Sequence, residues 1–177
     1  TSFLNVSGLL YLRLIDVSRN EIVEIKADNL LNLPRLNQIV LDHNKIISVD
    51  GHYLLSNLHT FSAMHNQISD IPHSLLFSVK DLLLEGNNMK TFRSSEVARI
   101  GLNGLVLNGN KIDVIDPDSF QYMTVLRILS IAKNKITQIQ DLPLFPALTS
   151  LTLDNNPLQF IGAHIFLSLP ILRTLSL

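Results

Sequence analysis

Apolar residues recur along this chain at a regular spacing, and an asparagine recurs with them. The pattern Leu-x-x-Leu-x-Leu-x-x-Asn-x-Leu, in which other apolar residues can replace leucine, occurs seven times in succession. The copies occupy residues 12–22, 36–46, 58–68, 79–89, 102–112, 126–136 and 148–158, and an eighth opens with Leu172, Leu175 and Leu177. Such repetition predicts that each copy forms one turn of a repetitive structure.

Each Leu-x-Leu pair alternates apolar and variable residues, which is typical of a short strand with one buried face. Stacked copies therefore place their strands in parallel, about 4.8 Å apart. The asparagine follows where the chain leaves the strand. Its amide can satisfy buried backbone groups of its own and the next turn, whereas aspartate lacks the donors. We predict a structural ladder made of Asn20, Asn44, Asn66, Asn87, Asn110, Asn134 and Asn156.

The seven consecutive copies resemble the leucine-rich repeat family, and their spacing of 21 to 24 residues resembles the extracellular-type repeats of Toll-like receptor and chaoptin-like ectodomains. The resemblance implies an α/β fold. It is a right-handed solenoid, or horseshoe, with a parallel β-sheet on the concave face and short helical or extended segments on the convex face. It also implies an outer phenylalanine, which Phe120 and Phe166 match, while Leu30 stands at the same position of another repeat.

Residues 1–177 are expected to form one solenoid of about seven full repeats plus the start of an eighth, as an interior fragment of a longer repeat domain. A hydrophobic content of 46% indicates a folded chain. With 14 basic and 15 acidic residues, the chain has almost no net charge to attract it to nucleic acid or to an anionic membrane. We therefore expect neither a nucleic-acid partner nor membrane insertion by this segment. The absence of cysteine excludes disulfides and zinc-thiolate sites.

Catalytic chemistry finds little support in the sequence, and we expect no enzyme activity, no metal and no cofactor. Asp42 and His43 are adjacent, so on a strand they point to opposite faces. Asp113, Asp116 and Asp118 do not have the spacing of a calcium loop and suit turns and caps. His43 and His65 precede asparagines of successive repeats, so they are expected to approach one another, either as surface residues without a role or as a pH-dependent pair.

The variable residues between the leucines are expected to point outward from the concave face, where solenoids of this kind bind ligands. In the middle repeats these positions hold an apolar group flanked by acids, and the predicted ligand-binding residues are Val40, Asp42, Met64, Asp81, Leu83, Glu85 and Val106. The group suits a protein or peptide ligand that is basic around an apolar anchor. The alternative is that apolar residues at these positions merely suit a strand surface.

The resemblance favours part of the ectodomain of a receptor, adhesion or matrix protein, extracellular or at the cell surface. The alternative is an intracellular leucine-rich-repeat adaptor or scaffold in the cytoplasm, which the lack of cysteine favours. Asn5, in the triplet Asn5-Val6-Ser7, is a glycosylation site only if the chain is secreted. Homodimers or heterodimers through the lateral or convex surfaces remain open.

Overall fold

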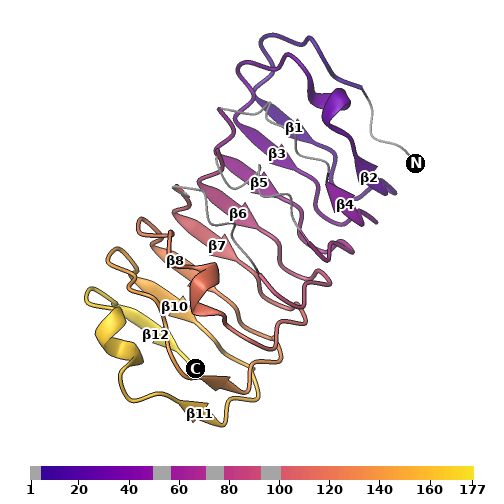
Figure 1. The fold of residues 1–177 in the computed structure, drawn as a ribbon. Coiled ribbons are helices and arrows are strands. Elements are labelled where there is room, and N and C mark those ends of the chain that lie inside the picture. The colour runs from indigo at the N-terminus through magenta and orange to yellow at the C-terminus, as the bar shows by residue number, and fades with distance from the viewer. Residues whose placement is uncertain (1–4, 50–56, 71–77, 93–100) are drawn as a thin grey trace.

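Parallel strands stacked in chain order form the main sheet of the molecule, which the computed structural model describes for residues 5–49, 57–70, 78–92 and 101–177 (Figure 1). The sheet has eight strands, and the first and the last of them lie at opposite ends of the array. The strands are β1 (Leu14–Asp16), β3 (Gln38–Val40), β5 (Thr60–Ser62), β6 (Asp81–Leu83), β7 (Gly104–Val106), β8 (Ile128–Ser130), β10 (Ser150–Thr152) and β12 (Thr174–Ser176).

The strand register confirms the alignment of the repeats. Ile39 pairs with Phe61 on one side and with Ile15 on the other, so equivalent residues of successive repeats lie side by side. Each strand begins one residue before the Leu-x-Leu pair and includes only its first apolar residue. That residue is buried in every strand from β1 to β10. The main core therefore lies directly behind the concave sheet.

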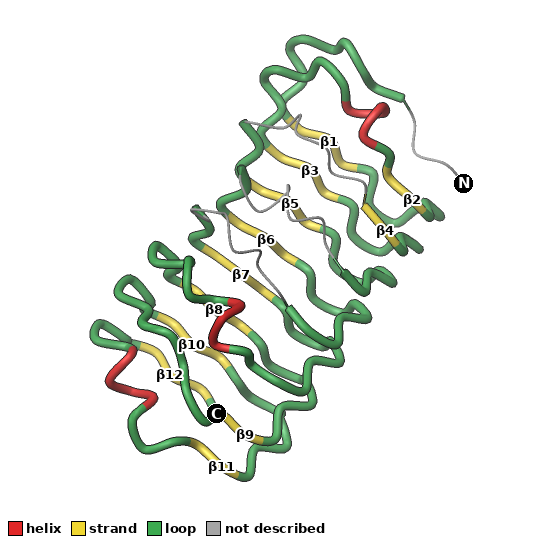
Figure 2. The backbone as a smooth tube through the Cα atoms, in the orientation of Figure 1, coloured by secondary structure: helices red, strands yellow, loops and turns green. Residues whose placement is uncertain are grey.

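The outer side of the solenoid consists of shorter elements, because a turn of 21 to 24 residues leaves little chain for them. Two pairs of strands lie there, namely β2 (Glu24–Ile25) with β4 (Ser48–Val49), and β9 (Gln138–Ile139) with β11 (Phe160–Ile161). Every helix in the described residues is a short 3-10 helix, as Figure 2 shows for η1 (Ala27–Leu30), η3 (Pro117–Ser119) and η4 (Ile165–Ser168). In this part of the chain no helix has the length and apolar character needed to cross a membrane.

Three phenylalanines contact one another behind the sheet and link successive turns, one pair stacked and the other edge to face. The ring of Phe120 lies 5.4 Å from that of Phe92 and 6.1 Å from that of Phe145. Both Phe120 and Phe166 match the outer phenylalanine position of the family pattern, but Phe120 is buried whereas Phe166 is 46% exposed. In η4 the neighbouring Ile165 turns inward instead and is 2% exposed.

The residue before each ladder asparagine adopts a left-handed backbone conformation. Its φ lies between 54° and 69° in all seven repeats, at Arg19, His43, His65, Gly86, Gly109, Lys133 and Asn155. Glycine adopts this conformation freely because it has no Cβ. In other residues the Cβ clashes with the backbone, which costs about 1 kcal/mol or more. The same left-handed turn therefore precedes each asparagine of the ladder.

Candidate functional site

Buried asparagines join successive turns behind one end of the strands. In the repeat of Asn110, the side-chain Nδ2 donates to the carbonyls of Leu84 at 2.9 Å and Leu107 at 3.1 Å. Its Oδ1 accepts from the backbone nitrogen of Met89 at 3.0 Å. Leu84 and Met89 belong to the preceding turn, so the amide links its own turn to the preceding turn rather than to the next one. Equivalent buried amides are Asn44, Asn66, Asn87 and Asn134.

The two outermost members of the ladder are less enclosed. Asn20 is exposed, and its Nδ2 donates to the carbonyls of Val17 and Ser18 within its own turn. Asn156 is half-buried and still reaches the preceding turn, where its Nδ2 donates to Ile131 at 2.9 Å. All seven predicted asparagines therefore hydrogen-bond to backbone groups, and burial of the amide is greatest where turns cover it on both sides.

The structure brings the seven predicted ligand-binding residues together on the neighbouring strands β3, β5, β6 and β7 and just beyond them. Ser62 separates Val40 from Leu83, whereas Leu83 and Val106 are direct cross-strand neighbours. Met64 follows β5, between the turns of Asp42 and Glu85. All seven are half-buried rather than fully exposed. They form a shallow surface, which we call the acidic-apolar patch, consisting of Val40, Asp42, Met64, Asp81, Leu83, Glu85 and Val106.

One acid of the patch is already engaged in the sheet. The Asp42 carboxylate accepts from the Ser62 hydroxyl at 2.6 Å and from the Met64 backbone nitrogen at 2.9 Å. It thereby satisfies Ser62, whose hydroxyl is otherwise out of reach of solvent because the residue is only 3% exposed. Asp42 thus links its turn to the following one and presents only part of its charge to a ligand.

The same bridge recurs at two other places that the sequence analysis missed. The Asn108 Oδ1 accepts from the Ser130 hydroxyl and from the Ala132 backbone nitrogen, both at 2.8 Å. Asp154 accepts from the Ser176 hydroxyl. We call these contacts the serine bridges. A sequence signal exists, since an Asp or Asn just after one Leu-x-Leu pair is followed one repeat later by a serine inside the next pair.

Asp81 and Glu85 are the acids of the patch outside the serine bridges. A Cβ at Gly104 would lie 2.8 Å from the Asp81 Oδ1, so the glycine leaves room for this carboxylate across the neighbouring strand. Glu85 lies beside Asn108, whose Nδ2 is 3.5 Å from its Oε2. The Asp81 carboxylate therefore lies next to the neighbouring strand, and the Glu85 carboxylate lies beside the turn that follows it.

His43 and His65 approach one another as expected. Their rings stack with centroids 4.5 Å apart and planes inclined by 18°. Gly86 occupies the equivalent position of the next turn, and a Cβ there would lie 2.5 Å from the His65 Nδ1. The glycine therefore serves both the left-handed turn and the packing of the imidazole.

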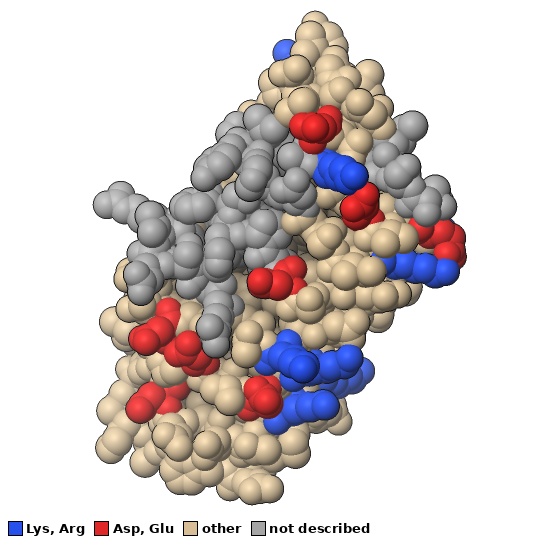
Figure 3. All heavy atoms as spheres, turned by 45° about the vertical axis from the view of Figure 1, so that its right-hand side comes forward, with Lys and Arg blue, Asp and Glu red and all other residues tan. Residues whose placement is uncertain are grey.

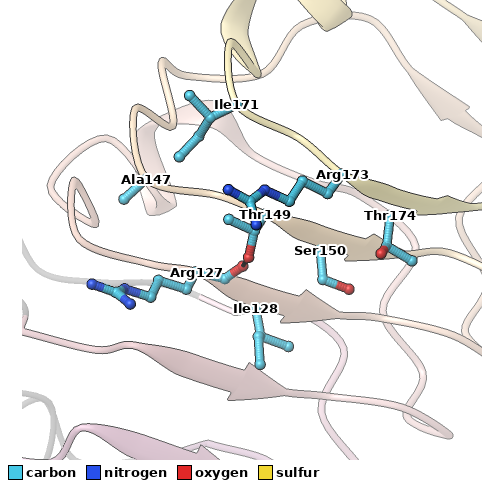
Figure 4. A pocket seen from close by; sticks show the side chains of 8 residues that line it. All are labelled: Arg127, Ile128, Ala147, Thr149, Ser150, Ile171, Arg173 and Thr174. Atoms are coloured by element: carbon cyan, nitrogen blue, oxygen red, sulfur yellow. Dashed lines mark hydrogen bonds between the residues drawn. The ribbon is translucent and has the colours of Figure 1, made fainter.

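A hollow of about 560 Å³ lies at the other end of the sheet, where β8, β10 and β12 begin. Its floor consists of the small residues Ala147, Thr149 and Ser150, and its walls include Arg127 and Arg173 (Figure 4). The sequence analysis did not identify this hollow, since it depends on small side chains between larger ones on the two adjacent turns.

Other candidate groups have structural roles. Asp116 caps η3, because its carboxylate accepts from the Asp118 backbone nitrogen at 3.1 Å. Within the described ranges, no three histidine or acidic side chains converge as a metal site. In the lower part of the view in Figure 3, basic side chains gather in one group, and most acidic side chains there lie apart from it. Asn5 is exposed, and its Oδ1 accepts from the Ser7 backbone nitrogen at 3.0 Å.

The repeats, the parallel sheet and the asparagine ladder define a leucine-rich-repeat solenoid. The family model described as "Leucine rich repeat" matches residues 100–143, and the chain is similar to known leucine-rich-repeat proteins. Podocan-like protein 1 of Mus musculus is 27% identical over 94% of the chain, and osteomodulin of Bos taurus is 32% identical over 88% of it. The chain spans 31% and 38% of these two relatives.

A solved structure has the same fold. The crystal structure of a TLR13-ssRNA13 complex matches with a TM-score of 0.75 and 22% identity over 91% of this chain and 24% of that one. At this identity the match shows the fold alone. It confirms a parallel-sheet solenoid with little helix.

Proposed function

We propose that this chain is the recognition part of an extracellular receptor, adhesion or matrix protein and binds a protein or peptide through the acidic-apolar patch. The leucine-rich-repeat homologues include matrix proteins and receptors, which supports a module for protein interaction. The patch is the observation on which the proposed site rests. It joins Leu83 and Val106 on neighbouring strands with Met64 nearby and the carboxylates of Asp81 and Glu85 among them.

The chemistry of the patch specifies the ligand. Half-buried apolar side chains surrounded by polar groups provide the anchors that dominate binding energy at protein interfaces. The neighbouring carboxylates increase the rate of association with a basic partner and disfavour an acidic one. The ligand is therefore a polypeptide with a lysine or arginine next to an apolar side chain. Met64 and Leu83 are its energetic centre.

The test is selection of binding peptides from a random library displayed on phage, followed by measurement of Kd for the enriched peptides. We expect basic-apolar sequences to be enriched. Met64→Arg places a cation in the patch and is expected to weaken binding by roughly 30-fold, equivalent to about 2 kcal/mol. Gln121→Arg, on the exposed outer side, is the control and should leave Kd unchanged. Normal binding by Met64→Arg together with loss in Gln121→Arg would place recognition on the convex surface.

Extracellular location has its own test at Asn5. Its exposed amide in an Asn-x-Ser triplet is available for N-glycosylation on the secretory route. When the protein is expressed in animal cells, an endoglycosidase should increase its mobility on a gel, and Asn5→Gln should abolish that shift. A protein that stays in the cytoplasm and has no glycan would instead support an intracellular adaptor.

A further inference from the structure

The hollow at the start of β8, β10 and β12 results from a size difference between successive turns. Ser150 pairs with Ile128 on one side and with Thr174 on the other, so the middle turn presents a small side chain beside a large one. Ala147 and Thr149 extend the same small floor, whereas Arg127 and Ile171 are large. Figure 4 shows the long side chains standing around the floor from the two flanking turns.

Two arginines flank this floor at equivalent positions. The Thr149 backbone nitrogen donates to the Arg127 carbonyl and the Arg173 nitrogen to the Thr149 carbonyl, both at 2.9 Å. The arginines are thus two strand spacings apart, about 10 Å between backbones, which lets both guanidinium groups reach one anion. Among the residues that the structure describes, the ion pairs are Lys26–Glu24 and Lys45–Glu21, so neither arginine has a carboxylate there.

The walls of the hollow also have an apolar component. Ile128 and Ile171 are each 48% exposed on opposite sides of it. The Thr149 hydroxyl is already engaged with the backbone, because it donates to the Arg127 carbonyl at 3.1 Å. A ligand that fits must therefore combine an anionic group with an apolar one. Arginine favours carboxylates because its planar donors bind both oxygens.

We propose that this hollow binds an acidic segment of a partner protein. A glutamate or aspartate lies between Arg127 and Arg173, and an adjacent apolar side chain packs against Ile128 and Ile171. The site extends the proposed function, because it adds a subsite of opposite charge on the same concave sheet. A polyanion such as nucleic acid is disfavoured, since it needs a dense basic surface and this hollow has two cations beside isoleucines.

The two subsites together restrict the partner further. The middle strand of the hollow, β10, lies three strand spacings from β6, about 14 Å across the sheet. A ligand that uses both has its basic and acidic groups about four extended residues apart. Each subsite can also be tested by itself, because no residue is shared between them.

The probe is a fluorescein-labelled hexapeptide of alternating glutamate and leucine, with binding followed by fluorescence anisotropy. Arg127→Gln and Arg173→Gln should each weaken binding about tenfold or more, as expected for loss of a charge-assisted contact. Arg13→Gln is the matched control, because Arg13 has the equivalent position in the first repeat, away from the hollow. The Kd of Arg13→Gln for the peptide should stay within about twofold of the Kd of the parent protein. All these arginines are exposed, so unchanged thermal unfolding will confirm intact folds.

Three results would overturn the proposal. The first is equal binding of a peptide in which glutamine replaces glutamate. The second is unchanged peptide binding by Ile128→Ser, since the apolar wall would then contribute nothing. The third is tighter binding of a heparin hexasaccharide than of the peptide, which would identify a polyanion surface. Met64→Arg should not affect the acidic peptide, so failure of this site and failure of the acidic-apolar patch remain distinguishable.

Discussion

The concave sheet has two halves with the same interior and different surfaces. Between β3 and β7 the outward positions hold the apolar and acidic side chains of the patch. From β8 to β12 they hold mainly hydroxyl groups, beside the arginine-flanked hollow. Behind the sheet, Phe61 in the first half and Leu129 in the second are equally buried, at 2% and 1% exposure. The comparison separates the residues that stabilise the array from those free to select a ligand.

The comparison requires that the asparagine ladder stabilises both halves of the sheet equally. Substitutions in this ladder are expected to have the largest effect on stability. Asn66 and Asn134 have equivalent hydrogen bonds, including Oδ1 contacts of 2.9 and 3.0 Å to the preceding turn. Replacing either with alanine leaves buried backbone groups unpaired and should cost roughly 1–3 kcal/mol. Urea unfolding measures the free energy of unfolding of both alanine variants. Asn20→Ala is the milder control, since this amide is exposed. A cost in one half only would show that the ladder is not uniform.

The left-handed turns give the next largest expected effect on stability. Two of these turns in the first half have glycine, Gly86 and Gly109, whereas the turns of the second half have Lys133 and Asn155. Gly86→Ala should cost about 1–2 kcal/mol from its φ of 69°, and more from contact with His65. Gly109→Ala has a similar φ of 62° but ordinary contacts of 3.6 Å, so only the backbone cost applies. Adding His65→Ala should remove the difference between the two variants in thermal unfolding. A persistent difference would refute the steric explanation.

The serine bridges give a smaller effect. Asp42→Ala removes the acceptor for Ser62 and Met64 and should cost about 0.5–1.5 kcal/mol. Asp42→Asn should be nearly neutral, because Asn108 makes the same bridge in its own repeat. The asparagine variant should still slow association with a basic peptide at low salt, as stopped-flow fluorescence would show. Equal stability of the alanine variant and the parent would contradict a structural role for the bridge.

The smallest effect is at Asp16 on β1, outside both halves. Hydrogen bonds from the Ser18 hydroxyl and backbone hold the pKa of Asp16 below its ordinary 3.8. Because its pKa is lowered in the folded state, Asp16 stabilises the fold at pH values above its ordinary pKa. This stabilisation is lost as the pH falls through the lowered pKa. Ser18→Ala should raise the pKa, measured from the carboxyl carbon shift in NMR, while Ser18→Thr should keep it low. An unchanged pKa in the alanine variant would exclude the hydroxyl as a cause.

Much of the fold follows from the sequence because the period is short and each copy repeats the same contacts. The positions of the strands, their register and the asparagine ladder all follow from alignment of seven copies. The direction of the ladder does not, since an amide can reach either neighbouring turn. Phe166 shows a second limit. The spacing matches the family pattern, but the rotation of η4 decides whether Phe166 or Ile165 faces inward.

The candidate sites were less predictable for two physical reasons. The sequence predicts which positions alternate with the buried leucines, but the burial of their side chains depends on neighbours across the sheet, and the residues of the patch are half-buried. The hollow depends on small residues between large ones at equivalent positions of three turns, as at Ile128, Ser150 and Thr174. No single repeat contains that signal. It becomes visible only when the repeats are compared column by column.

The serine bridges also determine which repeats can be exchanged between proteins. An amide of the ladder needs only backbone groups from its neighbour, whereas a serine bridge requires a matching side chain in the next turn. In the described residues the bridges start at Asp42, Asn108 and Asp154. Residues 79–89 therefore form a repeat with no serine bridge on either side. This repeat contains Asp81, Leu83 and Glu85 of the proposed patch, so exchange of this one module would test the patch without breaking a serine bridge.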